Sequence, residues 1–115
     1  MKEVNGDKIR LQHILLAIDE ILNYIENYDF NVFVDDSKTK FASIKQLEII
    51  GEAANHITDE TKTKFSDVEW QKITGLRNIL VHEYFGIDEK IVWGIITKDL
   101  PILRTVIFNI IQKIN

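Results

Sequence analysis

The stretch KTKFASIKQLEIIGEAANHIT, residues 38–58, decides the fold class of this chain. Its large apolar side chains recur three or four positions apart, which is the spacing of one face of an α-helix. The apolar residues on this face are Ile44, Leu47, Ile50, Ala54 and Ile57. Gly51 lies inside the helix at a cost of about 1 kcal/mol relative to alanine. A glycine at such a position indicates that another helix approaches closely.

The same periodicity continues on both sides of this stretch. It predicts a first helix over residues 7–28, a third over 67–84, a short fourth over 88–96 and a last helix that begins at residue 99. Residues 59–65 are polar and predict a connection. The apolar residues 29–36 predict a loop packed on the bundle, with a short strand as the alternative. Helices of this length with short connections predict an all-α fold, an antiparallel four- to five-helix bundle in a single domain over residues 1–115.

Three of these helices begin with residues that are typical of helix starts. Ser66 followed by Glu69 forms a capping box, which predicts the start of the third helix. Asp88 and Asp99 are predicted N-caps of the fourth and the last helix. Pro101 follows in the first turn of the last helix, where its missing N–H group is harmless.

Composition limits the classes of protein to which this chain can belong. With one proline and five glycines in 115 residues, it has few of the turn-forming residues that an all-β fold needs. It has no cysteine, which excludes disulfides and thiolate metal sites. No apolar run is long enough to span a membrane, and the first residues lack the apolar core of a secretory signal. We therefore expect a soluble cytoplasmic protein with no membrane contact.

The net charge of −4 bears on possible nucleic-acid partners. Proteins that wrap nucleic acid non-specifically are usually basic, because neutralisation of phosphates supplies most of the affinity. An RNA substrate of this chain would therefore be held locally, by a few cations.

Four polar residues gather in the segment RNILVHEY, residues 77–84: Arg77, Asn78, His82 and Tyr84. Histidine can transfer a proton near neutral pH, and arginine presents a fork of donors that stabilises a phosphate and its transition state. Asparagine can orient a phosphate or the histidine, and tyrosine offers a hydroxyl for hydrogen bonding or modification. These residue types together suit the cleavage of a phosphodiester.

The spacing within this segment leaves its geometry open. Asn78 and His82 share one face of a helix, whereas Arg77 and His82 diverge by roughly 140° on an ideal helix. They converge only if Arg77 reaches around, if the helix unwinds near His82, or if a second chain presents both sets of groups to one cleft. An arginine and a histidine near a helix end also fit a solvated surface, where histidine favours the helix dipole. Spacing alone therefore leaves a catalytic and a structural interpretation open.

The wider sequence resembles the HepT-like branch of the HEPN superfamily. The signature segment is GLRNILVHEYF, residues 75–85, in which arginine is followed by a polar residue, three more residues, histidine, one further residue and tyrosine. Further similar segments are QLEIIGEAAN at 46–55, VEW at 68–70, IVW at 91–93 and DLP at 99–101. The resemblance thus covers nearly the whole chain.

This resemblance implies a dimer of HEPN-like helical bundles whose two signatures face each other. It implies a metal-independent endoribonuclease, without a cofactor, that acts as the toxin of a toxin–antitoxin pair. Arg77 and His82 would be the catalytic pair, and Asn78 a supporting polar group. The antitoxin would be an MNT-type minimal nucleotidyltransferase that silences the toxin by attaching AMP to Tyr84.

Alternative interpretations stand beside this one. A non-catalytic helical subunit that binds a nucleotide or a minimal nucleotidyltransferase would use the same motif without cutting RNA. Glu52 is a candidate for orienting Arg77, although a solvated face is the simpler interpretation of its position. His13 and His56 lack the spacing of a metal pair, so we expect no metal site.

Overall fold

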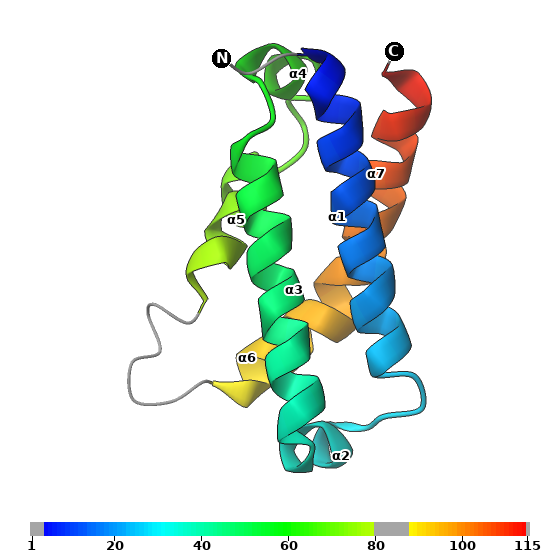
Figure 1. Cartoon of the computed structure of the whole chain (residues 1–115), viewed down its shortest axis with the longest axis vertical. Coiled ribbons are helices and arrows are strands. Elements are labelled where there is room, and N and C mark those ends of the chain that lie inside the picture. Colours follow the sequence, from blue (N-terminus) through cyan, green and yellow to red (C-terminus); the bar gives the residue numbers. More distant parts are fainter. Residues whose placement is uncertain (1–3, 80–87, 115) are drawn as a thin grey trace.

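The computed structural model describes residues 4–79 and 88–114, and every regular element in this part of the chain is a helix. The three longest helices are α1 (Val4–Tyr24), α3 (Ser37–Asn55) and α7 (Leu100–Lys113). Figure 1 shows them side by side, with α3 and α7 running antiparallel to α1, so that α1 begins and α7 ends at the same end of the bundle. The predicted all-α bundle is confirmed.

The core lies between these three helices. Each contributes isoleucine or leucine side chains that are fully buried, and burial of one such side chain stabilises the fold by roughly 1.5–3 kcal/mol. The fully buried residues of these helices include Leu11, Ile14, Ile18, Ile21, Ile44, Leu47, Ile50, Leu100 and Ile107. Ala54 and Ile57 are also buried, so the burial predicted within residues 38–58 is confirmed. The helix itself ends at Asn55, earlier than predicted, and Ile57 is buried just beyond its end. The first helix begins and ends earlier than predicted, at residues 4 and 24 in place of 7 and 28. Shortly after its end, Asn27 takes a φ of 65°, a left-handed conformation that asparagine tolerates and that a helix cannot continue through.

The segment predicted as a loop over residues 29–36 is a short helix, α2 (Phe30–Asp35). Asp29 caps this helix by accepting a hydrogen bond from the backbone N–H of Val32 at 2.9 Å. The ring of Phe33 is fully buried and lies 5.0 Å from the ring of Trp93. The predicted loop was wrong. The apolar residues of this segment form a short helix, and its Phe33 side chain packs into the core.

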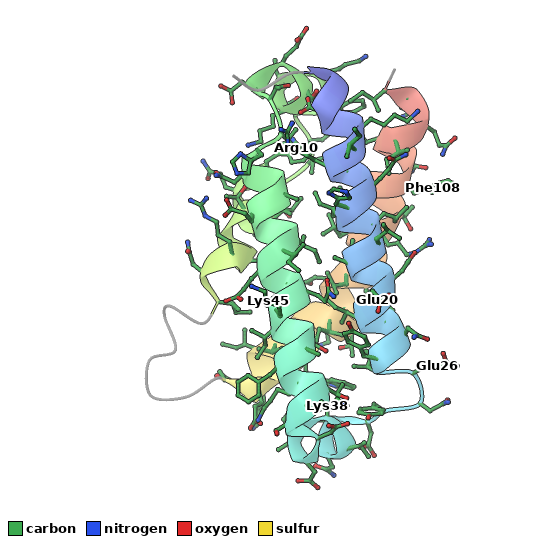
Figure 2. The ribbon with its side chains drawn as sticks, viewed as in Figure 1. Arg10, Glu20, Glu26, Lys38, Lys45 and Phe108 are labelled. Atoms are coloured by element: carbon green, nitrogen blue, oxygen red, sulfur yellow. The ribbon has the colours of Figure 1, made fainter. Side chains whose placement is uncertain are left out.

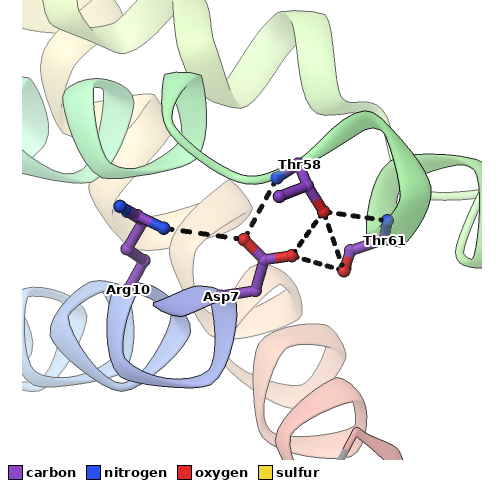
Figure 3. Close-up of polar contacts among 4 residues, drawn as sticks. All are labelled: Asp7, Arg10, Thr58 and Thr61. Atoms are coloured by element: carbon purple, nitrogen blue, oxygen red, sulfur yellow. Dashed lines mark hydrogen bonds and ion pairs between the residues drawn. The ribbon is translucent and has the colours of Figure 1, made fainter. Parts of the chain in front are cut away.

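The predicted connection over residues 59–65 also contains a helix, α4 (Asp59–Lys64), which Thr58 caps through the N–H of Thr61. The buried Asp7 of α1 holds this turn in place (Figure 3). Its carboxylate accepts hydrogen bonds from the backbone N–H of Thr58 at 3.1 Å and from the hydroxyls of Thr58 and Thr61 at 2.6 and 2.5 Å. A buried carboxylate needs such partners, so this network joins the start of α1 to the start of α4.

The third predicted helix begins later than its capping box indicated. Residues 65–67 form a turn, and α5 runs over Trp70–Gly75 with no side-chain cap. The indole N–H of the buried Trp70 donates to the carbonyl of Phe65 at 3.0 Å, which ties the turn to the helix. Tertiary packing of Trp70 therefore overrides the local signal at Ser66. After Gly75 the chain tightens into the 3₁₀-helix η1 (Leu76–Asn78), and residues 80–84 of the predicted helix lie outside the described residues.

The fourth predicted helix is confirmed as α6 (Glu89–Gly94), which Asp88 caps through the N–H groups of Lys90 and Ile91. It continues through a π-helical turn, η2 (Ile95–Asp99), directly into α7. Asp99 has helical backbone angles and makes no side-chain cap, so the predicted break at this residue was wrong. The π turn holds the chain helical where the sequence indicated a new start.

Charged side chains cover the outside of the bundle. Figure 2 shows three of them on the outer surface, Glu20 on α1 and Lys38 and Lys45 on α3, and all three side chains are exposed. Phe108 on α7 is an apolar exception, with 45% of its surface exposed. Among the helices of residues 4–79 and 88–114, none combines the length and the apolar character that crossing a membrane requires.

Candidate functional site

Arg77 and Asn78 lie in η1, which rests directly on α3 at Gly51. A Cβ atom added to Gly51 would lie 2.2 Å from the backbone nitrogen of Arg77 and 2.9 Å from its Cα atom. Only glycine permits such an approach without displacing one of the two backbones. The close contact predicted at Gly51 is therefore present, and it brings the backbone of Arg77 against α3.

The guanidinium of Arg77 lies beside the carboxylate of Glu52, the residue after Gly51. Arg77 Nη1 is 3.6 Å from Glu52 Oε2, and Glu52 Oε1 is 3.0 Å from Nε2 of His56 one helical turn further on. The side chains of Arg77 and Glu52 are 36% and 56% exposed. An ion pair this open to water contributes about 0–1 kcal/mol to stability. This ion pair can therefore orient the guanidinium of Arg77, but it adds little to the stability of the fold.

The helix that carries the signature departs from α geometry at Arg77 itself. The tightened turn of η1 begins at Leu76. An unwinding near His82 was one of three ways to bring Arg77 and His82 together, and it stays untested. His82 and Tyr84 lie outside the described residues. The approach of His82 to Arg77, and the position of Tyr84 beside them, stay predictions.

A pocket of about 420 Å³ opens beside Arg77 and Asn78. Its other lining residues come from α3, α4 and α5, and they include Lys62, Gln71 and Thr74. Two cations and several amide and hydroxyl groups thus face one space, which is a set of groups that binds phosphate and ribose oxygens. Lys62 was missed by the sequence analysis, because α4 was assigned to a connection and nothing local links it to Arg77.

A second cavity, of about 440 Å³, lies between α5 and α7. Apolar side chains dominate its walls, among them Val68, Leu76, Leu103 and Val106, and neither Arg77 nor Asn78 lines it. Lys72 also lines this cavity, but together with the carboxylates of Asp67, Glu69 and Asp99, so its walls do not attract a phosphate and the cavity is separate from the candidate site.

In residues 4–79 and 88–114, no three histidine, aspartate or glutamate side chains come together as a metal site. His56 contacts Glu52 at the edge of the candidate site, and His13 is exposed on α1.

Comparison with known proteins gives a consistent set of relatives. The family model described as "Ribonuclease HepT-like" matches residues 14–110. Two relatives carry the name "Putative RNase". The first, from Methanocaldococcus jannaschii, is 38% identical over 97 residues, which cover 84% of this chain and 89% of the relative. The other, from Caldanaerobacter subterraneus, is 38% identical over 103 residues and covers 90% and 92%.

A third relative is named "Probable ribonuclease HepT" and comes from Thermococcus cleftensis. It is 36% identical over 94 residues, covering 82% of this chain and 86% of the relative. No solved structure matches this chain.

Proposed function

Since the chain belongs to the HepT-like ribonuclease family and is an endoribonuclease on that ground, we propose that it cuts RNA with Arg77 and His82 and acts as a toxin. The position of Arg77 carries this proposal. Its backbone packs against Gly51, its guanidinium lies beside Glu52, and it lines a pocket that also contains Lys62. A guanidinium held at the edge of a cation-lined pocket is suited to a phosphodiester substrate.

The proposed reaction uses the substrate's own nucleophile. His82 removes the proton of the ribose 2′-hydroxyl, the 2′-oxygen bonds to the adjacent phosphorus, and the bond from phosphorus to the 5′-oxygen breaks. The protonated His82 then gives a proton to the leaving 5′-oxygen, directly or through a water molecule, and a 2′,3′-cyclic phosphate remains. Arg77 stabilises the negative charge that builds on the phosphorane, and Asn78 supports the orientation of the phosphate. The chain's own side chains supply these roles, so cleavage should persist in a chelator and leave cyclic phosphate ends.

A growth experiment tests the catalytic assignment. Expression of the wild-type chain without its antitoxin is expected to arrest growth, whereas Arg77→Ala and His82→Ala restore growth with the helical circular dichroism signal retained. If both variants arrest growth as the wild type does, the assignment of Arg77 and His82 is wrong.

We also assign the control of the toxin to Tyr84. An MNT-type nucleotidyltransferase would transfer AMP from ATP to the Tyr84 hydroxyl and release pyrophosphate. The added phosphate and bulk would compete with RNA for the cations of the site. Co-expression followed by intact-mass measurement is expected to show one added AMP, and Tyr84→Phe is expected to abolish it. An unmodified wild-type chain in active co-expression would remove this part of the proposal.

The proposed assembly is a homodimer in which the two signatures face one cleft, acting on RNA in the cytoplasm. The alternative is a non-catalytic subunit that binds the nucleotidyltransferase. A purified dimer that binds this partner but never cleaves RNA would favour the alternative.

A further inference from the structure

The pocket beside Arg77 extends the candidate site away from the signature, toward α4. It is formed where α3, α4, α5 and η1 meet, and its volume is about 420 Å³. Pockets that enclose small molecules occupy roughly 300–1,000 Å³, so one nucleotide unit fits this space.

The pocket concentrates positive charge in a chain whose net charge is −4. Lys62 and Arg77 both line it, and none of the residues that line it within 4–79 and 88–114 carries a carboxylate. Glu52 lies 3.6 Å from Arg77 and offsets part of that charge. The ammonium of Lys62 forms no ion pair with any residue in the described ranges. Lys62 therefore supplies the uncompensated charge, and an anionic ligand is attracted to it.

The uncharged lining favours recognition of a sugar–phosphate backbone. Gln71, Thr74 and Asn78 offer amide and hydroxyl groups to phosphate and ribose oxygens. Trp70 is buried, and its indole N–H is already bonded to the carbonyl of Phe65 at 3.0 Å. Trp70 also lines the pocket, but only 8% of its surface is exposed, so little of its ring is open to a stacking base.

We infer that this pocket is a second RNA-backbone subsite, in which Lys62 holds a phosphate that flanks the one cut beside Arg77. The inference rests on the proposed function, because it takes RNA to be the substrate of the Arg77 site. A flanking phosphate is bound equally in the ground state and the transition state. Lys62 therefore lowers KM without changing kcat. Contacts to phosphate and sugar oxygens carry no sequence information, so we expect the subsite to act on RNA of any sequence.

The first test measures binding of a fluorescent 2′-O-methyl oligouridylate, which cannot be cut because its attacking hydroxyl is blocked. Fluorescence anisotropy is recorded between about 50 and 200 mM salt for the full chain and its variants. Lys62→Gln is expected to weaken binding about three- to tenfold and to lower the slope of log K against log salt by about 0.7, as for one lost phosphate contact on a single strand. Lys62→Arg keeps the charge and is expected to keep the wild-type slope.

Lys64→Gln is the matched control. It removes the same charge from the same helix, but Lys64 is exposed and does not line the pocket. Its slope is expected to equal that of the wild type. A wild-type slope in Lys62→Gln overturns the subsite, and so do equal losses in Lys62→Gln and Lys64→Gln, because these would show only an effect of net charge. Thermal melting followed by circular dichroism establishes that the variants are folded.

Cleavage of an unmodified oligonucleotide separates this inference from the proposed function. If the wild type cuts RNA and Arg77→Ala does not, the proposed function stands, and Lys62→Gln is expected to raise KM about three- to tenfold with kcat unchanged. A wild-type KM in Lys62→Gln then overturns the subsite alone. A wild-type chain that binds the blocked oligonucleotide through Lys62 but cuts nothing overturns the proposed function and leaves the subsite standing.

Discussion

A methyl group added at Gly51 would lie 2.2 Å from the backbone nitrogen of Arg77, so one backbone must move. Gly51→Ala should therefore lower the free energy of unfolding by about 1–3 kcal/mol through overpacking, although alanine alone would favour the helix by about 1 kcal/mol. Ribonuclease activity should fall as well, because Arg77 is displaced. Urea denaturation and a cleavage assay measure the two effects.

Gly94→Ala is the control for this prediction. Gly94 has helical backbone angles, and nothing lies within 4 Å of a Cβ atom added there. This substitution should leave stability unchanged or raise it by up to about 1 kcal/mol. Equal stabilities of the two variants would contradict the close approach of η1 to α3.

The contact between Glu52 and Arg77 gives a second prediction at the residue scale. Glu52→Gln keeps the shape of the side chain and removes an exposed ion pair, so stability should change by less than about 1 kcal/mol. If Glu52 orients the guanidinium, kcat should fall while KM changes little. Full activity together with full stability would show that Glu52 belongs only to the solvated surface. Glu48→Gln, one turn earlier on α3, is the matched control.

At the scale of the elements, Asp36 joins α2 to α3 as a cap. Its carboxylate accepts hydrogen bonds from the Tyr28 hydroxyl at 2.6 Å and from the Thr39 hydroxyl and N–H at 2.7 and 3.1 Å. These hydrogen bonds lower the pKa of Asp36 from 3.8 to about 2, with the Tyr28 hydroxyl as the largest cause. The cap is thus made by a charged carboxylate.

A pH dependence follows from this lowered pKa. A carboxyl whose pKa is lower in the folded state stabilises the fold above its unfolded pKa, and the contribution is lost as the pH falls through the folded value. The wild type should therefore be more stable than Asp36→Asn above about pH 4, and the difference should shrink toward pH 2. Urea midpoints measured across this range test it. Asp35→Asn, an exposed neighbour with the same change of charge, should show no such convergence.

At some helix boundaries, tertiary packing outweighs the capping residues that the sequence shows. Asp88 caps α6 as its sequence predicts, because the capping residue and the helix start are adjacent in the chain. The capping box at Ser66 is unused, since the burial of Trp70 and its bond to Phe65 place the helix start later. Capping energies are about 1 kcal/mol, which is less than the burial of one large aromatic side chain provides.

At the scale of the whole molecule, the proposed dimer gives a complementation experiment. Arg77→Ala and His82→Ala chains are each inactive alone in the proposed mechanism. If each site takes its arginine from one chain and its histidine from the other, a mixed dimer contains one intact site. An equal mixture should then recover up to about a quarter of wild-type activity, because half of the dimers are mixed.

The result of this mixing decides between two geometries. Recovery of activity requires a site shared between two chains. If the mixture stays inactive, each site uses Arg77 and His82 of the same chain. Size-exclusion chromatography with light scattering must show dimers that exchange subunits. A monomer at every concentration would contradict the shared site.

The sequence alone determined the all-α class and the buried apolar residues of α3, and it predicted Arg77 and Asn78 as site residues. Each depends on periodicity or on a compact motif, and both are local properties of the chain. The tertiary structure decided that η1 rests on Gly51, that Glu52 faces Arg77 and that Lys62 shares a pocket with Arg77. These contacts join residues that are distant in sequence, and they arise only when hydrophobic burial sets the helices against one another.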